Sequence, residues 1–383
     1  MCGNQTEIAR DSKMKICLVG GAVRDRLLGL PVNERDWVVE GATDDEMLAA
    51  GFRRADADFP VFLHPDTREE YALARTEQKT GPGYKGFVVN AEPSVTLEQD
   101  LARRDLTINA VAEDEQGQLI DPFDGQGDLK QQVLRHITPA FEEDPVRVLR
   151  VARFAARFGS LGFEVAPETK ALMCKMSASG DLGTIKPERL WQEMSKALRT
   201  DQPWRFFAVL HDCGALAVLI PELDAAIKAA SPLNHLRNAT MQGGNRAVRF
   251  ATLMYSVIAE GESLFDLCNK LRVERDCMEL LELLVQLGPD FVSAGNAGAE
   301  GLHGLLVAVK ALQQPERFRN FILACTAIWP DEAEITTQRL NHALEAMQGV
   351  DPKELLAEGF KGQEIGDELA QRRVKAIKAR LDS

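Results

Sequence analysis

Apolar and polar positions follow two different patterns along the chain. Up to about residue 130, short apolar runs bounded by turn residues predict buried strands. These runs lie at residues 15–21, 36–41, 60–65 and 69–76. Residues 22–29 follow the first run with the periodicity of a helix. Two segments rich in glycine and polar residues, 76–86 and 119–129, predict an irregular loop and a cluster of turns.

From residue 139 onwards the pattern becomes helical. Amphipathic stretches rich in alanine and leucine cover residues 144–158, 166–177, 187–199 and 203–218, and the rest of the chain has the same character without an internal repeat. The fold class predicted is α+β, with an N-terminal head followed by an all-helical neck, body and tail. We expect four segments: an N-terminal extension at 1–13, the head at 14–140, a neck and body at 141–225, and a tail at 226–383.

Composition narrows the class of protein. The 383 residues are 45% hydrophobic and 27% charged, which is enough to bury a core in more than one domain. No apolar run approaches the ~20 residues that span a bilayer, and residues 1–13 lack the apolar core of a signal peptide. We therefore expect a cytoplasmic protein with no membrane partner and no obligate protein partner.

Charge and metal-binding residues exclude further classes. The net charge of −13 disfavours indiscriminate coating of RNA, but it leaves binding through local basic clusters open. The seven cysteines are scattered without a C-x-x-C pair, and no two of the six histidines stand four residues apart. The sequence thus predicts neither a disulfide framework nor a structural zinc site.

An acidic pair at the start of the second apolar run is the first candidate for chemistry. In an extended segment, the side chains of Glu34 and Asp36 project from the same face, so they could share one cation. Two carboxylates at a strand end are a minimal Mg²⁺ site for nucleotide chemistry, since Mg²⁺ takes its other ligands from phosphate and water. Alone, such a triplet is more often a solvated loop.

A glycine pair between the first strand and the following helix is the second candidate. Gly20 and Gly21 would let main-chain N–H groups approach a phosphate closely at a helix N-terminus. Arg24, one turn into the helix, could reach the same anion. The alternative is an ordinary turn in which Arg24 forms an ion pair with Asp25 or Asp36.

An arginine-rich helix is the third candidate. Asp144 followed by Pro145 is a good helix start. At 100° per residue, the next four arginines fall within an arc of about 120°, opposite an apolar side. They are Arg147, Arg150, Arg153 and Arg157. The alternative is a plain cationic surface.

The segment LVGGAVRDRLLGLPVNERDWVV resembles the signature of the class II bacterial tRNA nucleotidyltransferases, the CCA-adding enzymes of the polymerase-beta superfamily. The resemblance continues through RRDLTINA (103–110), DPFDGQGDL (121–129), EDPVRVLRVARFAARF (143–158) and GFKGQEIGDELAQRR (359–373). It implies a polymerase-beta-type head, and the addition of C, C and A to the 3′ end of tRNA from CTP and ATP.

The resemblance also implies roles for individual residues. Glu34 and Asp36 would be the catalytic carboxylates that hold Mg²⁺, with Glu70 as a third ligand although Glu69 stands beside it. Asp144 and Arg147 would select the base, and Asn109 would contact a ribose hydroxyl or be a buried hydrogen-bonding residue. The full set of implied nucleotide contacts is Gly20, Gly21, Arg24, Arg104, Asn109, Asp144, Arg147, Arg150 and Arg153.

One position departs from the family pattern. The usual pair is Asp-x-Asp, whereas this chain has Glu34, whose side chain is longer by one C–C bond of about 1.5 Å. We expect activity to be retained because the other motifs are intact. The loop at 76–86, with Arg75 and Glu77, resembles the flexible loop that family members use to switch from C to A, which disfavours an enzyme that adds only CC.

The C-terminal half suggests RNA binding without a second active site. Tyr255 and Ser256 stand where related bacterial proteins carry a His-Asp doublet, so we expect no metal-dependent phosphohydrolase activity. Four basic residues near the end could contact tRNA, or could be an ordinary solvated helix end. They are Arg372, Arg373, Lys375 and Lys378.

Two alternatives to CCA addition remain open. An enzyme that adds only A, or a poly(A) polymerase, would share the fold and the motifs of the head. A catalytically inactive RNA-binding protein would account for Glu34, for the missing His-Asp doublet and for the acidic net charge.

Overall fold

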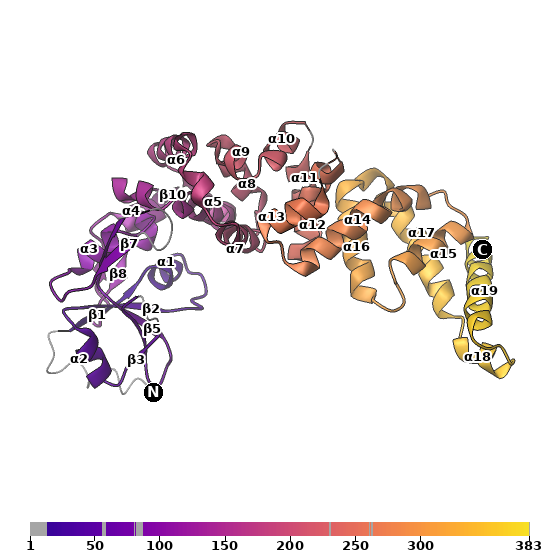
Figure 1. Cartoon of the computed structure of the whole chain (residues 1–383), viewed down its shortest axis with the longest axis horizontal. Helices are drawn as coiled ribbons and strands as arrows, with labels where there is room; N and C mark the ends of the chain where they lie inside the picture. Colours follow the sequence, from indigo (N-terminus) through magenta and orange to yellow (C-terminus); the bar gives the residue numbers. More distant parts are fainter. Residues whose placement is uncertain are drawn as a thin grey trace. The chain divides into compact units, whose positions relative to one another are not determined.

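The computed structural model describes residues 14–55, 59–79, 81, 87–229, 231–259, 261 and 263–382. The chain divides into two compact units (Figure 1). Unit 1 comprises Met1–Arg189 and Val209–Leu219, and unit 2 comprises Leu190–Ala208 and Ile220–Ser383. The four segments expected from the sequence remain a prediction.

A seven-stranded sheet organises the N-terminal part of unit 1. Its strands are β1 (Lys15–Val19), β2 (Asp36–Glu40), β3 (Arg53–Arg54), β4 (Val61–Leu63), β5 (Glu70–Leu73), β8 (Ala112–Glu113) and β9 (Leu119–Ile120). Their order is β3-β4-β5-β2-β1-β8-β9. Strands β2 and β5 run parallel, and the other neighbouring pairs run antiparallel. The four predicted strands are confirmed.

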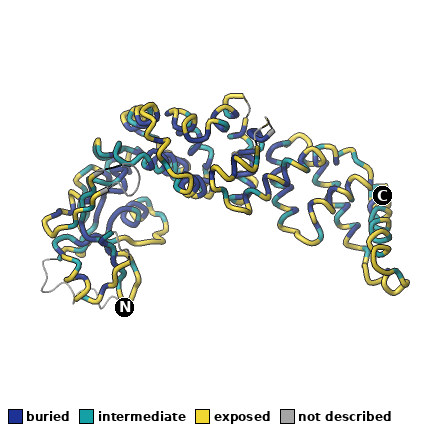
Figure 2. Tube along the Cα trace, viewed as in Figure 1, coloured by how far each residue is buried: buried dark blue, intermediate teal, exposed yellow. Residues whose placement is uncertain are grey.

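The sheet is buried on both faces, which explains why its strands are nearly continuous apolar runs. Successive residues of a strand point to opposite faces: Val38 belongs to one apolar cluster and Val39 to the other. Helix α3 (Leu97–Ala102) contributes Leu101 to the first cluster, and α2 (Asp44–Ala49) contributes Met47 to the second. Figure 2 shows this buried interior as dark segments of the trace.

Two segments of the head are more regular than their composition predicts. Residues 76–79 form strand β6 (Thr76–Lys79), which pairs antiparallel with β7 (Phe87–Asn90), so the expectation of an irregular loop is wrong there. Residue 80 and residues 82–86 of that predicted loop lie outside the described residues. The predicted turn cluster at 119–129 contains β9 and the start of α4 (Gly125–Gln131).

Helix α4 begins where the sequence shows glycine because a carboxylate caps it. Asp121 accepts hydrogen bonds from the main-chain N–H groups of Gly125 and Gln126, at 2.7 and 2.9 Å. A Cβ at position 125 would lie 2.4 Å from the main-chain oxygen of Thr107. The glycine is therefore required by close packing of the helix against the neighbouring turn, and is not a helix breaker.

The remainder of unit 1 is mainly helical. Its elements are α1 (Gly21–Leu27), η2 (Thr107–Asn109), β10 (Val133–Leu134), η3 (Pro139–Glu143), α5 (Val146–Phe158), η4 (Gly159–Leu161), β11 (Glu164–Val165), α6 (Pro167–Ser179), η5 (Asp181–Thr184) and α9 (Ala215–Leu219). The two-residue strand β11, parallel to β10, is an exception to the all-helical neck and body that we expected. Helices α7 (Pro187–Ala197) and α8 (Trp204–Asp212) span the unit boundaries.

Unit 2 is helical throughout its described residues. After the shared α7 and α8 it contains α10 (Pro221–Ala229), α11 (Pro232–Met241), α12 (Arg246–Ala259), α13 (Leu264–Leu271), α14 (Arg275–Ala294), α15 (Ala299–Ala308), α16 (Pro315–Ile328), α17 (Pro330–Gln348), α18 (Pro352–Ala357) and α19 (Gln363–Leu381). Tyr255 on α12 packs edge-on against Trp329, with ring centroids 5.2 Å apart. Within the described residues, no helix combines the length and apolar character needed to cross a membrane.

Candidate active site

The acidic pair lies at the N-terminal end of β2. Asp36 is the first residue of the strand, and Glu34 precedes it by two positions in an exposed segment. Asp36 as a whole residue is solvent-exposed. Its carboxyl group nevertheless lies among protein atoms that keep water away, and this raises its pKa. The nearby Glu34 carboxylate raises that pKa further. The Arg104 guanidinium acts in the opposite direction. The structure thus brings Glu34, Asp36 and Arg104 into one electrostatic environment.

Glu70 is the neighbour of Asp36 in the sheet. In the parallel pairing of β2 with β5, Asp36 is directly in register with Glu70, so their side chains share a face. The adjacent Glu69 is engaged elsewhere: it accepts a 2.9 Å hydrogen bond from the indole of Trp37 and pairs with Arg35 at 3.4 Å. Of the two glutamates, Glu70 is the one placed beside the acidic pair.

The acidic end of β2 fits a divalent cation that arrives with a nucleotide. Carboxylate oxygens are the ligands that Mg²⁺ prefers, and the rise in the pKa of Asp36 caused by Glu34 is the repulsion that a cation would relieve. In the part of the chain that the structure describes, no three His, Cys, Asp or Glu side chains are grouped so as to hold a metal by themselves. Phosphate oxygens would have to supply the other ligands.

The turn between β1 and α1 requires glycine at position 20. Gly20 has φ of 67°, and a Cβ there would lie 2.7 Å from Nη1 of Arg104. The Arg104 side chain donates to Asp100 at 3.1 Å, while its Nε is buried without a hydrogen-bond partner among the described residues. The structure therefore places Arg104 against the glycine turn, and the same guanidinium lowers the pKa of Asp36.

Arg24 and Asn109 are buried and bonded to protein groups. The guanidinium of Arg24 donates to Asp25 at 2.8 Å and to the side-chain oxygen of Asn109. The amide nitrogen of Asn109 donates to Asp105 at 2.8 Å. These contacts match the alternatives that the sequence left open, an ion pair with Asp25 and a buried hydrogen-bonding asparagine, and contact of either residue with a nucleotide remains a prediction.

Helix α5 starts as predicted from the Asp-Pro pair. Asp144 Oδ1 accepts a 3.0 Å hydrogen bond from the main-chain N–H of Val146, so one of its two oxygens serves as the helix cap. Arg147 turns back to the main chain, where it donates to the carbonyl oxygens of Ala140, at 2.8 Å, and Arg103. Burial lowers the pKa of Arg147.

The arginine face of α5 is not a plain cationic surface. Arg150 donates to Asp105 at 2.6 Å, and Arg157 donates to Asp25 at 2.8 Å. The guanidinium of Arg153 lies 4.2 Å from the centroid of the Phe154 ring. Although burial alone would raise the pKa of Asp105, Arg150 and Asn109 outweigh it and hold that pKa well below its usual range.

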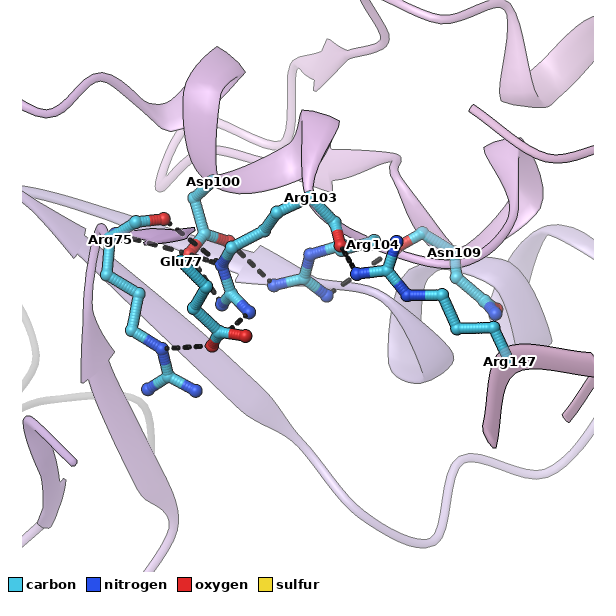
Figure 3. A network of polar contacts seen from close by, with 7 residues as sticks. All are labelled: Arg75, Glu77, Asp100, Arg103, Arg104, Asn109 and Arg147. Atoms are coloured by element: carbon cyan, nitrogen blue, oxygen red, sulfur yellow. Dashed lines mark hydrogen bonds and ion pairs between the residues drawn. The ribbon is translucent and has the colours of Figure 1, made fainter. Parts of the chain in front are cut away.

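A second network links the β6 strand to α3 (Figure 3). Glu77 accepts from Arg75 at 3.0 Å and from Arg103 at 2.9 Å, and Asp100 accepts from Arg103 at 2.8 Å. Figure 3 shows Arg147 reaching the main-chain oxygen of Arg103 on the other side of this network. Sequence reasoning missed Asp100. It could have been found from its spacing, because it precedes Arg103 by three residues and Arg104 by four, which places all three on one face of a helix.

The basic residues near the C-terminus differ in their surroundings. On α19, Arg372 donates to Glu358 at 2.9 Å and to Glu368 at 2.9 Å. Arg373 is partly buried, and burial lowers its pKa, whereas Lys375 and Lys378 are exposed.

Comparison with known sequences decides the family. The description "Poly A polymerase head domain" belongs to a family model that matches residues 16–135, and "Probable RNA and SrmB-binding site of polymerase A" to one that matches residues 162–227. A CCA-adding enzyme of Coxiella burnetii is 46% identical over 367 residues, which cover 96% of each chain. The chain belongs to the CCA-adding enzyme family. A multifunctional CCA protein of Thioalkalivibrio sulfidiphilus is also 46% identical, covering 95% of this chain and 98% of that protein.

Solved structures of CCA-adding enzymes share the fold. One apo form superposes with a TM-score of 0.72 at 23% identity, covering 95% of this chain and 88% of that one. The Thermotoga maritima CCA-adding enzyme complexed with tRNA gives a TM-score of 0.71 at 22% identity, covering 96% and 88%. The predicted α+β head with a helical remainder is therefore confirmed as the architecture of this family.

Proposed function

We propose that this protein adds C, C and A to the 3′ end of tRNA, using CTP and ATP and releasing pyrophosphate. The observation that carries the proposal is the 46% identity of this chain to a protein named CCA-adding enzyme, over nearly the whole length of both proteins. Solved structures of the same fold include complexes with tRNA, with CTP and with ATP. We place the reaction in the cytoplasm, where tRNA and both nucleotides are available.

The catalytic residues that we propose are Glu34 and Asp36, with Glu70 beside them. Their carboxylate oxygens would hold a divalent cation, for which we propose Mg²⁺. When bound, such an ion neutralises triphosphate charge and lowers the pKa of the attacking 3′-hydroxyl. Gly21 would offer its main-chain N–H group to phosphate at the start of α1, beside Gly20, whose own N–H donates to the carbonyl oxygen of Val111 at 3.2 Å. Arg104 would add positive charge next to the same turn.

Nucleotide selection would fall to the start of α5. The exocyclic amino group shared by C and A can donate to a carboxylate oxygen of Asp144, while Arg147 can donate to an adjacent ring acceptor. G and U present the opposite pattern at these positions and would be rejected. In the free protein Arg147 is bonded to two carbonyl groups, so it must exchange those contacts for the base. Arg150 and Arg153 would support the nucleotide from the same helix.

The test is nucleotide incorporation into three tRNA transcripts, ending before CCA, after C and after CC, with each labelled NTP singly and in pairs. We expect two C and one A on the shortest transcript, followed by a stop. Extension of only the CC-ending transcript would indicate an A-adding enzyme, and long A tracts a poly(A) polymerase. Binding of tRNA without incorporation would indicate an inactive RNA-binding protein.

The acidic pair is tested by a matched set of variants. Asp36→Asn should lower kcat at least about a hundredfold, because it removes a charged metal ligand. Glu40→Gln, at the other end of β2 in a 3.7 Å ion pair with the exposed Lys15, is the control and should retain activity. Glu34→Asp, which restores the usual family residue, should be at least as active as the wild type. Full activity in Asp36→Asn would contradict the assignment.

A further inference from the structure

A chain of polar side chains joins the head to two positions on α5, and the helix itself closes this chain into a ring. Every member lies in unit 1, and the members are three arginines, two aspartates and one asparagine. We call it the polar ring. Its members are Arg24, Asp25, Asp105, Asn109, Arg150 and Arg157.

Asp25 connects α1 with the last turn of α5. Its Oδ1 accepts from Nε and Nη2 of Arg24 at 2.9 and 2.8 Å, and its Oδ2 accepts from Arg157 at 2.8 Å. Asp25 is 7% exposed and Arg24 is 3% exposed, so water can do little to replace either partner. The carboxylate of Asp25 is thus shared by two arginines from elements far apart in the sequence.

A second connection between Arg24 and α5 runs through Asn109 of η2 and through Asp105. Arg24 donates to Asn109, Asn109 donates to Oδ1 of Asp105, and Arg150 donates to Oδ2 of Asp105 at 2.6 Å. This path reaches α5 seven residues before Arg157, a separation of about 10 Å along the helix axis. Because the ring holds one helix at two separate points, it fixes both the distance and the rotation of α5 relative to the head.

Aromatic contacts reinforce the same arrangement. The guanidinium of Arg24 lies 5.2 Å from the ring centroid of Phe154 and 5.0 Å from that of Phe158, and both rings are buried on α5. A cation over an aromatic face is held more firmly where water is excluded. Arg24 therefore contacts α5 directly, and Asp25 holds its guanidinium in place.

We propose that Asp25 is a positioning residue for nucleotide binding: it keeps α5, whose start selects the base, in register with the glycine turn that precedes α1. The proposal rests on the proposed function, in which Asp144 and Gly21 meet the same nucleotide. Removing the charge of Asp25 leaves three arginines of the ring facing one carboxylate, that of Asp105. Arg24 and Arg157 then lose the negative charge that they share and repel each other. Of the ion pairs in the polar ring, the one between Asp105 and Arg150 remains as a link to α5, beside the packing of Arg24 on Phe154 and Phe158.

The first test is steady-state kinetics of full-length Asp25→Asn on a tRNA transcript ending before CCA. KM for CTP and for ATP should rise at least about fivefold, kcat should fall less, and the Kd for tRNA should stay unchanged. The incorporation of UMP relative to CMP should also increase. Asp212→Asn, which removes a carboxylate from the exposed 2.9 Å ion pair with Lys170 in the same unit, is the matched control.

The second test uses Arg157, whose side chain is 37% exposed and can be replaced without opening a cavity. Arg157→Lys keeps the charge and a donor and should retain KM within about twofold, whereas Arg157→Met should behave like Asp25→Asn. The double variant should raise KM no further than the worse single variant, because both remove one contact. If Asp25→Asn does not fold, the Arg157 pair carries the test.

The outcomes separate this inference from the proposed function. A wild-type protein that incorporates no nucleotide would contradict the proposed function itself. An active wild type with unchanged KM in Asp25→Asn and in Arg157→Met would overturn the role of Asp25 alone. A lower Tm with unchanged KM would likewise overturn it, since that result is the mark of a purely structural residue.

Discussion

Two arginine-bearing helices of this protein use their charges in different ways. On α5, Arg150 and Arg157 pair with Asp105 and Asp25, carboxylates whose side chains are only 4% and 10% exposed. On α19, Arg372 pairs with Glu358 and Glu368, whose side chains are 47% and 27% exposed. The partners of Arg150 and Arg157 come from distant parts of the chain, whereas those of Arg372 lie within 14 residues of it.

The difference shows which arginines are committed to the architecture. A buried carboxylate has no water to replace a lost arginine, so each contact on α5 constrains the head against the helix. An exposed pair loses little when it opens, because solvent takes over both charges. The ion pairs of Arg150 and Arg157 should therefore respond to mutation as parts of a scaffold, and those of Arg372 as parts of a surface.

The largest effect should come from Asp105, which holds both Arg150 and Asn109. Asp105→Ala removes the acceptor of the Arg150 guanidinium, whose side chain is 37% exposed, and of the buried amide of Asn109, and should lower the free energy of unfolding by about 2–4 kcal/mol. Urea denaturation followed by circular dichroism measures the loss. The control is Asp212→Asn, which should change the midpoint little. A loss as small as the control's would contradict the distinction between the two helices.

A second effect should appear in the pH dependence of stability. The pKa of Asp105 is lower in the folded protein than its unfolded value of about 3.9. Its ion pair therefore contributes fully above that value, and the contribution is lost as the pH falls toward the folded pKa. Below about pH 4, unfolding free energy should depend on pH less steeply in Asp105→Asn, by up to about 1.4 kcal/mol per pH unit. Urea titrations of both proteins between pH 5 and 3 measure this, and parallel curves would contradict it.

The distinction between near and distant partners also separates what the sequence could predict from what it could not. Apolar periodicity located β1 and β2 and the start of α5, because those patterns are local. It missed β6, whose Thr, Glu, Gln and Lys give no apolar alternation, and α4, whose first glycine, Gly125, is explained only by its close contact with Thr107.

The candidate site residues also differ in whether their partners are near or distant in the sequence. The helix start at Asp144 and the ion pair between Arg24 and Asp25 each involve residues that are close in the sequence, so both could be predicted. The structure contains both contacts. The contact of Asp25 with Arg157 spans 132 positions, and no periodicity reports a pairing at that distance. Such long-range partners come only from the folded structure.

A smaller effect should come from the exposed lysines of α19. Lys375 and Lys378 are proposed contacts for the tRNA backbone, and each phosphate contact releases counterions on binding. Replacing both with alanine should weaken tRNA binding a few-fold, and reduce the slope of log K against log salt by about 1.5. Filter binding at several salt concentrations measures this, with Tm as a control for folding. An unchanged slope would indicate an ordinary solvated helix end.

The smallest effect should come from Arg372, although it pairs with two carboxylates. Its guanidinium is bonded to Glu358 and Glu368, so it has little capacity left for phosphate, and both partners remain hydrated when it is removed. Arg372→Ala should shift Tm by no more than about 2 °C, and tRNA affinity should stay within about twofold of the wild type. Glu358→Gln is the informative companion, because it frees the guanidinium while keeping the side-chain shape. Tighter tRNA binding by Glu358→Gln, with Arg372→Ala unchanged, would show that the ion pair withholds Arg372 from RNA. A large loss of tRNA affinity in Arg372→Ala would instead show that the pair opens when RNA binds, and the surface pairs of α19 would then be as functionally committed as the buried pairs of α5.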